Sequence, residues 1–283
     1  MKEIDSIAAF DHWMDEALIR LTDSPSPVFA WIQAGLDGLY GAILWALGLA
    51  PFYLVAVGVG LLGWRLVGLR FGGLAAVALA VCDWMGLWPE TIGTLALVMA
   101  ATLLALAVAV PAGILSSDVR VLERLSTPVL DLLQTLPPYI YLLPGIALLG
   151  YGPATALAST LVVAIPPAFR LSMLGMRMAP IEYVELGIAT GMTRWQMFVK
   201  IRLPFAIPSI MAGVNQSLMM AFGMVVIAGI VGSGGLGQTI YDAIRKLDIA
   251  KSIDAAIAIV ILTMILDRLS QSAHRAAPGG RKS

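Results

Sequence analysis

The sequence predicts an all-α membrane protein, a polytopic bundle of about seven transmembrane helices. Of its 283 residues, 59% are hydrophobic and only 13% are charged, and the mean hydropathy is +0.87. Soluble domains carry about 25% charged residues, so this chain has too little polar surface to coat a soluble globule of its size. Long charge-free runs also divide the chain into segments long enough to cross a bilayer.

The composition argues against several other classes of protein. Net charge is zero, so no basic face for nucleic acid is expected. The single cysteine, Cys82, cannot form an intrachain disulfide or a thiol zinc site, and His12 and His274 sit near opposite ends of the chain. We therefore expect no metal and no cofactor. The acidic start lacks the basic residues and apolar core of a cleavable signal peptide.

The predicted spans follow from the charge-free runs, since a crossing helix needs about 20 apolar residues. The run 132–169 is too long for one helix, and a glycine-rich break at 150–153 divides it in two. We expect the crossings at 51–66, 71–88, 91–117, two within 132–169, 209–231 and 252–270.

Orientation follows from the positive charges, because cytoplasmic loops are enriched in lysine and arginine. With an odd number of spans, 13 of the 18 lysines and arginines fall on one side of the membrane. The N-terminus is therefore predicted outside and the C-terminus in the cytoplasm. The aspartates of the spans are expected near helix ends, where they would not form a proton or ion path; these are Asp83, Asp131, Asp254 and Asp267.

The cytoplasmic loop at 177–204 is long and patterned. Pro180 is a helix-start signal, and Glu182 and Glu185 fall in the first turns, where acids suit the positive end of a helix. Gly191 is a natural stop, because helices commonly end on a residue that tolerates positive φ. This pattern predicts a first short helix that exposes both glutamates.

A second short helix is expected directly after this stop. Thr193 can cap it, Arg194 opens it and Pro204 closes it. The pattern predicts two short helices at an angle on the membrane surface. A linker that only rests on lipid headgroups would also suit the basic and aromatic residues here.

The loop resembles the one in permeases of binding-protein-dependent ABC importers. That family has Glu-Ala-Ala, then three residues, then Gly, and a Pro further on. Here the pattern reads Glu185-Leu186-Gly187, then Gly191, then Pro204, so two alanines are replaced and the spacing from Glu185 to Gly191 is intact.

Other stretches resemble one subfamily, which imports glycine betaine, proline betaine and choline; these are 134–137, 165–167, 208–220, 224–228, 234–237 and 265–269. The resemblance implies a type I ABC importer permease fold in the bacterial inner membrane. It assigns 91–270 to the importer domain with its coupling loop at 180–204. The rest would be a segment outside the membrane or at its surface (1–50), two accessory helices (51–90) and a cytoplasmic tail (271–283).

The resemblance also implies partners. The coupling loop would dock onto a separate ABC ATPase, a second copy of the chain would complete a homodimer, and an extracytoplasmic substrate-binding protein would deliver the substrate. The chain itself would not hydrolyse ATP. The residues expected in coupling are Glu182, Glu185, Gly187, Gly191, Thr193, Arg194 and Pro204. Glu185 would either contact the ATPase or brace the corner from within.

A substrate pathway is expected from two groups of residues. Tyr139, Tyr141 and Tyr151 gather near the outer ends of two predicted spans. Aromatic faces hold quaternary ammonium groups well, although an ordinary interfacial aromatic belt would look the same. The stretch that resembles the subfamily adds Asn215, Gln216 and Met220.

The glycine-rich stretch 232–237 does not predict a nucleotide site. It lacks the Gly-Lys-Ser/Thr end that places a lysine on phosphates, so we expect a flexible turn near the outer mouth of the pathway. The alternative function is an ion-coupled secondary transporter of small solutes, which would need no ATPase.

Overall fold

The computed structural model describes Glu16 and residues 27–276, and this part of the chain is helical with no strand. Most of the acidic N-terminal segment, His12, the side chain of His274 and the end of the predicted cytoplasmic tail lie outside the described residues.

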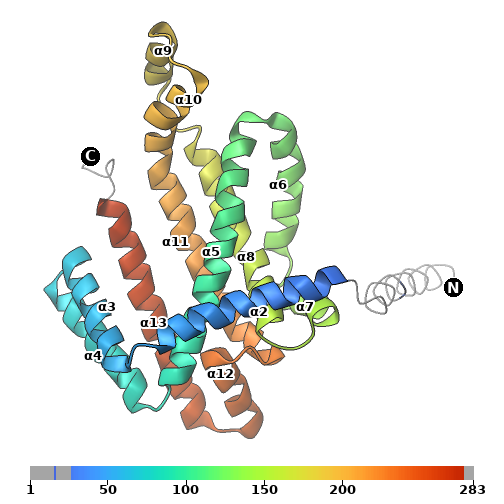
Figure 1. The fold of residues 1–283 in the computed structure, drawn as a ribbon, viewed down its shortest axis with the longest axis vertical. Helices are drawn as coiled ribbons and strands as arrows, with labels where there is room; N and C mark the ends of the chain where they lie inside the picture. Colours follow the sequence, from blue (N-terminus) through green and yellow to red (C-terminus); the bar gives the residue numbers. More distant parts are fainter. Residues whose placement is uncertain (1–15, 17–26, 277–283) are drawn as a thin grey trace.

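Three long helices form the centre of the molecule and run along its long axis (Figure 1). They are α5 (Trp88–Asp118), α8 (Pro153–Gly175) and α11 (Leu203–Ala228). Helix α8 packs extensively against both of the others. Buried alanines line these contacts, including Ala101 and Ala221. Small side chains let helix backbones approach closely, which is how helices associate in lipid.

The C-terminal part of the chain adds two helices and a corner at one end of the bundle. After a 3₁₀ turn, η3 (Gly229–Val231), comes α12 (Gly235–Lys246), which packs on α13 (Ile249–Ala276). Helix α13 also contacts α11. Helix α13 runs toward the end that carries the coupling loop but stops short of it, while α12 lies at the opposite end (Figure 1).

The predicted run 132–169 differs from expectation in its first half. The break before Pro153 is confirmed, since α8 begins there. The preceding pass starts earlier, with α6 (Arg120–Thr135), and bends by 107° into η1 (Pro138–Tyr141) and α7 (Leu142–Leu149). Two consecutive prolines at 137–138 stop α6, because proline cannot continue a helix.

Asp131, which the sequence predicts near the end of a span, lies near the end of α6 and close to the bend that follows this helix. Its carboxylate forms an ion pair at 2.5 Å with Arg170 of α8. The pair neutralises both charges, so Asp131 is not an isolated intramembrane acid.

Three further helices precede α5. Helix α2 (Pro27–Gly48) lies across α5 and α8 rather than along them, and it is bent by 90° from α3 (Phe52–Leu66). Helices α3 and α4 (Leu69–Trp84) pack on each other as a hairpin. They have 15 and 16 residues, and at about 1.5 Å per residue neither matches a hydrocarbon core of about 30 Å.

The span count is therefore lower than the expected seven or so. Among the described residues, four helices are long and apolar enough to cross a membrane, or up to six if each bent pair is one span. The two accessory helices predicted between residues 51 and 90 are present, but as a short hairpin.

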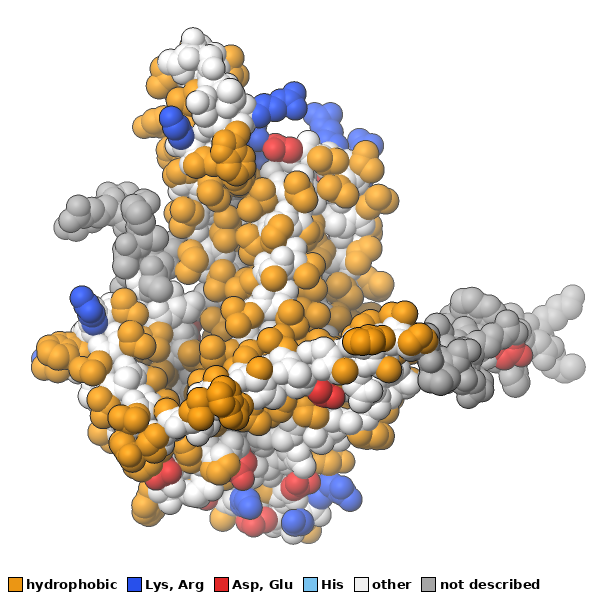
Figure 2. All heavy atoms as spheres, viewed as in Figure 1, with side chains coloured by type: hydrophobic (Ala, Val, Ile, Leu, Met, Phe, Trp, Pro, Cys, Tyr) orange, Lys and Arg blue, Asp and Glu red, His pale blue; other side chains and the backbone are white. Residues whose placement is uncertain are grey.

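The face of the molecule drawn in Figure 2 is apolar over its middle. Large hydrophobic side chains on the outside of the long helices include Leu103 and Val108 of α5, both more than half exposed. Charged groups gather near the two ends of the molecule. This arrangement suits lipid around the middle and water at both ends.

Candidate functional site

The loop that the sequence singled out forms the tip of the molecule, beyond the ends of α5 and α8 (Figure 1). It consists of α9 (Ile181–Ala189), a turn, and α10 (Arg194–Met197). The corner between α5 and α6 lies near it, and lysine and arginine side chains gather at this end of the molecule in Figure 2. The positive charges of the sequence predict that this end faces the cytoplasm. We refer to residues 180–204 as the coupling loop.

Helix α9 begins where the sequence predicts. Pro180 is its N-cap, and Glu182 and Glu185 are both exposed on its surface. Apolar side chains lie beside them, with Ile181 and Ile188 more than half exposed. A short helix that presents two carboxylates and several apolar groups to water is a surface suited to a protein partner.

Gly187 has a packing role that the sequence pattern did not reveal. It is the buried residue of α9 and faces the following helix. A Cβ atom there would lie 2.6 Å from Met197 Cε and 3.0 Å from Ile201 Cδ1. A small residue is needed because α9 packs closely on this helix, whereas the neighbouring Leu186 is exposed and free of that limit.

The turn after α9 confirms the local predictions. Gly191 has φ +71° and follows the C-cap, Thr190, which is the left-handed position that favours glycine. Thr193 then caps α10, accepting a hydrogen bond from the backbone N–H of Gln196, while the Gln196 side chain accepts from the Thr193 N–H. This capping box satisfies two donors that the helix start would otherwise leave free.

The prediction that Pro204 closes the second helix is wrong. Helix α10 continues through a π-helical segment, η2 (Phe198–Arg202), into α11, and the helix is unbroken over 38 residues, Arg194–Val231. Pro204 lies in the first turn of α11. We attribute the presence of a proline within this helix to the widened π turn directly before it. The wider turn relieves the clash between the proline ring and the preceding turn of the helix. One arm of the coupling loop is thus the end of a membrane-spanning helix.

The segment that leads from α8 into the coupling loop is held to the corner between α5 and α6 by Arg177. Its guanidinium donates to both carboxylate oxygens of Glu123 at 2.7 Å and to the carbonyl oxygen of Ser117 at 3.2 Å. A cation at the end of α5 also suits the negative end of that helix. Hydrogen bonding to Glu123 raises the pKa of Arg177, so the guanidinium stays charged.

The helical arm, which continues from α10 into α11, contacts the same corner through Arg202. Its Nη1 lies 2.5 Å from Oδ1 of Asp118, the last residue of α5. Both arms therefore meet residues 116–123, which we call the α5–α6 corner. The sequence predicts these arginines only as positive charges, because their partners lie 54 and 84 residues away along the chain.

A hollow opens beneath the coupling loop. Its volume is about 430 Å³, and its walls combine apolar and charged side chains from the loop and the corner: Asp118, Val184, Ile188, Met192, Arg194, Met197, Phe198 and Arg202. Trp195 stacks on Phe198 beside it and is 71% exposed. An exposed tryptophan next to a hollow is typical of a binding surface for another protein.

The tyrosines expected in a pathway lie near the bend between α6 and α7 and before α8. Tyr141 donates from its hydroxyl to the carbonyl oxygen of Leu133 at 2.8 Å, so it holds this bend together. Tyr139 and Tyr151 are exposed. Ring contacts between the described residues do not join any two of these tyrosines.

The other expected pathway residues lie on α11. Asn215 and Gln216 line a hollow of about 440 Å³ whose far side is formed by Ser270 and Gln271 of α13. Asn215 Oδ1 is buried without a hydrogen-bond partner, and Gln216 and Met220 are exposed. The hollow does not include the tyrosines, so the two groups do not share one site.

Comparisons with known proteins agree with this geometry. Residues 106–276 match the family described as "Binding-protein-dependent transport system inner membrane component". The chain is 36% identical over 244 residues to the glycine betaine transport system permease protein OpuAB of Bacillus subtilis, covering 86% of each chain. It is 34% identical over 270 residues to the glycine betaine/proline betaine transport system permease protein ProW of Escherichia coli, covering 95% of this chain and 76% of that one.

A third relative and a solved structure extend the comparison. The glycine betaine/carnitine transport permease protein GbuB of Listeria monocytogenes is 35% identical over 269 residues, covering 94% of this chain and 95% of that one. An inward-facing structure of the MetNI methionine ABC transporter contains a similar chain, with a TM-score of 0.61 and 23% identity, over 69% of this chain and 96% of that one. The likeness to the chain of the methionine transporter, at 23% identity, concerns the fold alone.

Proposed function

This chain belongs to the family of binding-protein-dependent transport system inner membrane components, and we propose that it carries a small quaternary amine through the membrane, driven by a separate ATPase. It is a membrane permease. Its substrate would be glycine betaine, proline betaine or choline.

The names of the relatives support this substrate class. The Bacillus, Escherichia and Listeria proteins are named for transport of glycine betaine, proline betaine or carnitine. These compounds share a quaternary ammonium group, which has no hydrogen-bond donor and is held best by aromatic faces and carboxylates. The exposed Tyr139 and Tyr151 are candidates for transient contact with such a group.

The coupling loop supports the ATPase partner, and its continuity with α11 is the observation that carries the proposal. A partner that moves the exposed surface of α9 and α10 would move a helix that reaches the far end of the molecule, because residues 194–231 form one unbroken rod. Rigid packed elements transmit such displacements, whereas a floppy loop would not. The glutamates at 182 and 185 would then meet the ATPase surface.

A homodimer would account for polar groups that face outward from the bundle. Gln216 is exposed in the middle of α11, and the Arg170–Asp131 pair is partly exposed between α6 and α8. Polar side chains within a bilayer face a protein neighbour or a water-filled path rather than lipid. A second copy of the chain would enclose them.

The test uses the complete transporter, with its ATPase and substrate-binding protein, in proteoliposomes. We expect accumulation of radiolabelled glycine betaine that requires enclosed ATP and is reduced by an excess of unlabelled choline or proline betaine. Uptake that continues without ATP and collapses with the ion gradient would instead support the ion-coupled secondary transporter. ATP-driven uptake of an unrelated solute alone would overturn the substrate class.

A further inference from the structure

Helix α6 carries a polar face along its length, although it belongs to a pass that is apolar enough to cross a membrane. The polar residues recur every three or four positions, a spacing that places them on one side of a helix; they include Arg120, Glu123, Arg124, Thr127, Asp131 and Gln134. A hollow of about 580 Å³ follows this face from Arg120 to Asp131. Polar side chains at membrane depth face a protein neighbour or a water-filled path rather than lipid.

The apolar residues of α6 lie on the opposite side of the helix. Val121, Leu125, Val129 and Leu132 are all more than half exposed. Helix α6 packs against α5 and α8, and it runs beside α5 from the end that carries the coupling loop (Figure 1). The polar face therefore leads from that end of the molecule along the bundle, toward the bend after α6.

The Arg170–Asp131 pair lies where this polar face meets the C-terminal half of α8. Nη2 of Arg170 donates to Oδ1 of Asp131 at 2.5 Å, and among the described residues this is the only hydrogen bond that either side chain makes. Nε of Arg170 is buried without a partner. The two side chains are 37% and 57% exposed, and Asp131 lines the hollow. A solute in the hollow can therefore reach the pair.

The pair between Arg177 and Glu123 is built differently. All three guanidinium nitrogens of Arg177 donate, to both carboxylate oxygens of Glu123 and to the carbonyl oxygens of Ser116 and Ser117. A guanidinium offers five N–H donors in a planar fork, and Arg170 uses one of them. Exposed ion pairs with so few contacts contribute little to stability, so the Arg170–Asp131 pair can open for a competing ligand at little cost.

We propose that the Arg170–Asp131 pair is a transient binding site that favours zwitterionic betaines over the cation choline. Arg170 takes the carboxylate of the betaine in its planar fork, while the quaternary ammonium lies against the carboxylate of Asp131. Such opposite charges attract each other more strongly beside a protein wall than in bulk water. Choline has a hydroxyl group in place of the carboxylate and gains no charge interaction from Arg170. This rests on the proposed function and narrows its substrate class.

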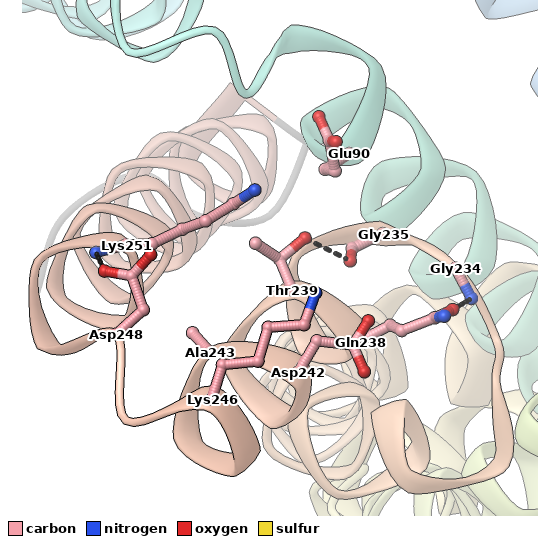
Figure 3. Close-up of a pocket in the computed structure, with 10 residues that line it drawn as sticks. All are labelled: Glu90, Gly234, Gly235, Gln238, Thr239, Asp242, Ala243, Lys246, Asp248 and Lys251. Carbon is pink, nitrogen blue, oxygen red and sulfur yellow. Dashed lines mark hydrogen bonds between the residues drawn. The ribbon is translucent and has the colours of Figure 1, made fainter.

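A second hollow also contains charges of both signs, at the opposite end of the molecule (Figure 3). Its basic residues are lysines, Lys246 and Lys251. A lysine ammonium is a compact, strongly hydrated charge that lacks the fork matching a carboxylate. Within the described part of the chain, no ion pair joins the charged residues of this hollow. We therefore place the betaine site at Arg170, and the second hollow supplies the control.

The test measures weak binding by saturation-transfer difference NMR on the permease–ATPase complex in lipid nanodiscs, without nucleotide or substrate-binding protein. Glycine betaine and choline are titrated separately, and their N-methyl protons give the two dissociation constants. The readout is the ratio of the choline constant to the betaine constant. The test variants are Arg170→Gln, Arg170→Lys and Asp131→Asn. The control is Asp242→Asn with Lys246→Gln, which removes one acid and one base from the second hollow. Gel filtration of each complex checks assembly.

The two halves of the pair should shift the ratio in opposite directions. We expect the unaltered complex to bind betaine about fivefold or more tightly than choline, and Arg170→Gln to bring the ratio to about one, because the carboxylate loses its charged partner. Arg170→Lys should keep part of the preference. Asp131→Asn should raise the ratio, because both ligands lose the ammonium contact while Arg170 becomes free for the carboxylate. The control should match the unaltered complex.

Three outcomes would overturn the site: no preference for betaine in the unaltered complex, a shift of the ratio in the same direction by Arg170→Gln and Asp131→Asn, or loss of the preference in the control. A pair that only holds α6 against α8 would give the second outcome, and a betaine site in the hollow of Figure 3 would give the third. Failure of the proposed function is separate, because proteoliposomes would then not accumulate betaine, whereas the binding ratio is measured without transport.

Discussion

At the scale of single residues, two glycines of the coupling loop serve different physical ends. Gly187 is needed for space, because Met197 and Ile201 pack against it. Gly191 is needed for backbone conformation, because its φ is +71° and nothing lies within 4 Å of the place a Cβ would take. Each glycine therefore makes its own prediction.

The effect of a substitution at Gly187 should depend on the size of the new side chain. Gly187→Ala is expected to retain most uptake, because the facing atom is the mobile end of Met197, while Gly187→Leu should force α9 away from the helix and lower ATP-dependent uptake about tenfold or more. The measurement is uptake normalised to complex recovered with the ATPase. Leu186→Met, a change at the exposed neighbour, is the control. Full uptake by Gly187→Leu would contradict the packing role.

The effect of a substitution at Gly191 should depend on the backbone preference of the new residue and not on its size. Gly191→Asn should keep most activity, since asparagine adopts the left-handed conformation readily, whereas Gly191→Val should strain the turn by about 1–2 kcal/mol and reduce coupling. Thermal stability of the complex and betaine-stimulated ATPase activity both check this. If asparagine and valine behave alike, the positive φ is not what the position requires.

At the scale of elements, the two arms of the coupling loop converge on the α5–α6 corner. Arg177 holds the start of the loop against Glu123 and the last carbonyls of α5, and Arg202 holds the helical arm against Asp118. Surface ion pairs contribute little to stability, about 0–1 kcal/mol each. Here the two ion pairs fix the position at which the coupling loop is attached to the α5–α6 corner.

A charge exchange tests this attachment. Arg177→Glu and Glu123→Arg should each lower uptake severalfold while ATP hydrolysis continues, and the double exchange should recover part of the loss, since contacting pairs show coupled effects. Recovery should be incomplete, because a glutamate at 177 cannot donate to the carbonyl of Ser117. Double-exchange uptake no better than the single variants would show that the pair does not position the loop.

At the scale of the whole molecule, the described chain leaves polar groups on the outside of a lipid-facing bundle. Gln216 and the Arg170–Asp131 pair are the main examples. We expect native mass spectrometry of the purified complex to show two copies of this chain with two ATPase subunits. A complex with one copy would contradict the homodimer, and Gln216 would then have to face a path within a single chain.

Much of this protein was determined by the sequence alone. Charge-free runs required lipid as the solvent, because no other environment accommodates so apolar a surface. The corner at Gly191 and the cap at Thr193 were predictable because each depends on φ or on a hydrogen bond within three residues. The resemblance at Glu185 and its neighbours identified the family for the same reason, since the motif is local.

Tertiary structure decided the rest. The helix runs past Pro204 because a π turn precedes it, the predicted pass before α8 is bent, and Gly187 is small because of a residue ten positions later. Arg177 finds Glu123 across 54 residues, and one hollow combines residues of α5, α12 and α13. These features depend on which distant segments of the chain pack together, and local sequence preferences do not specify those contacts.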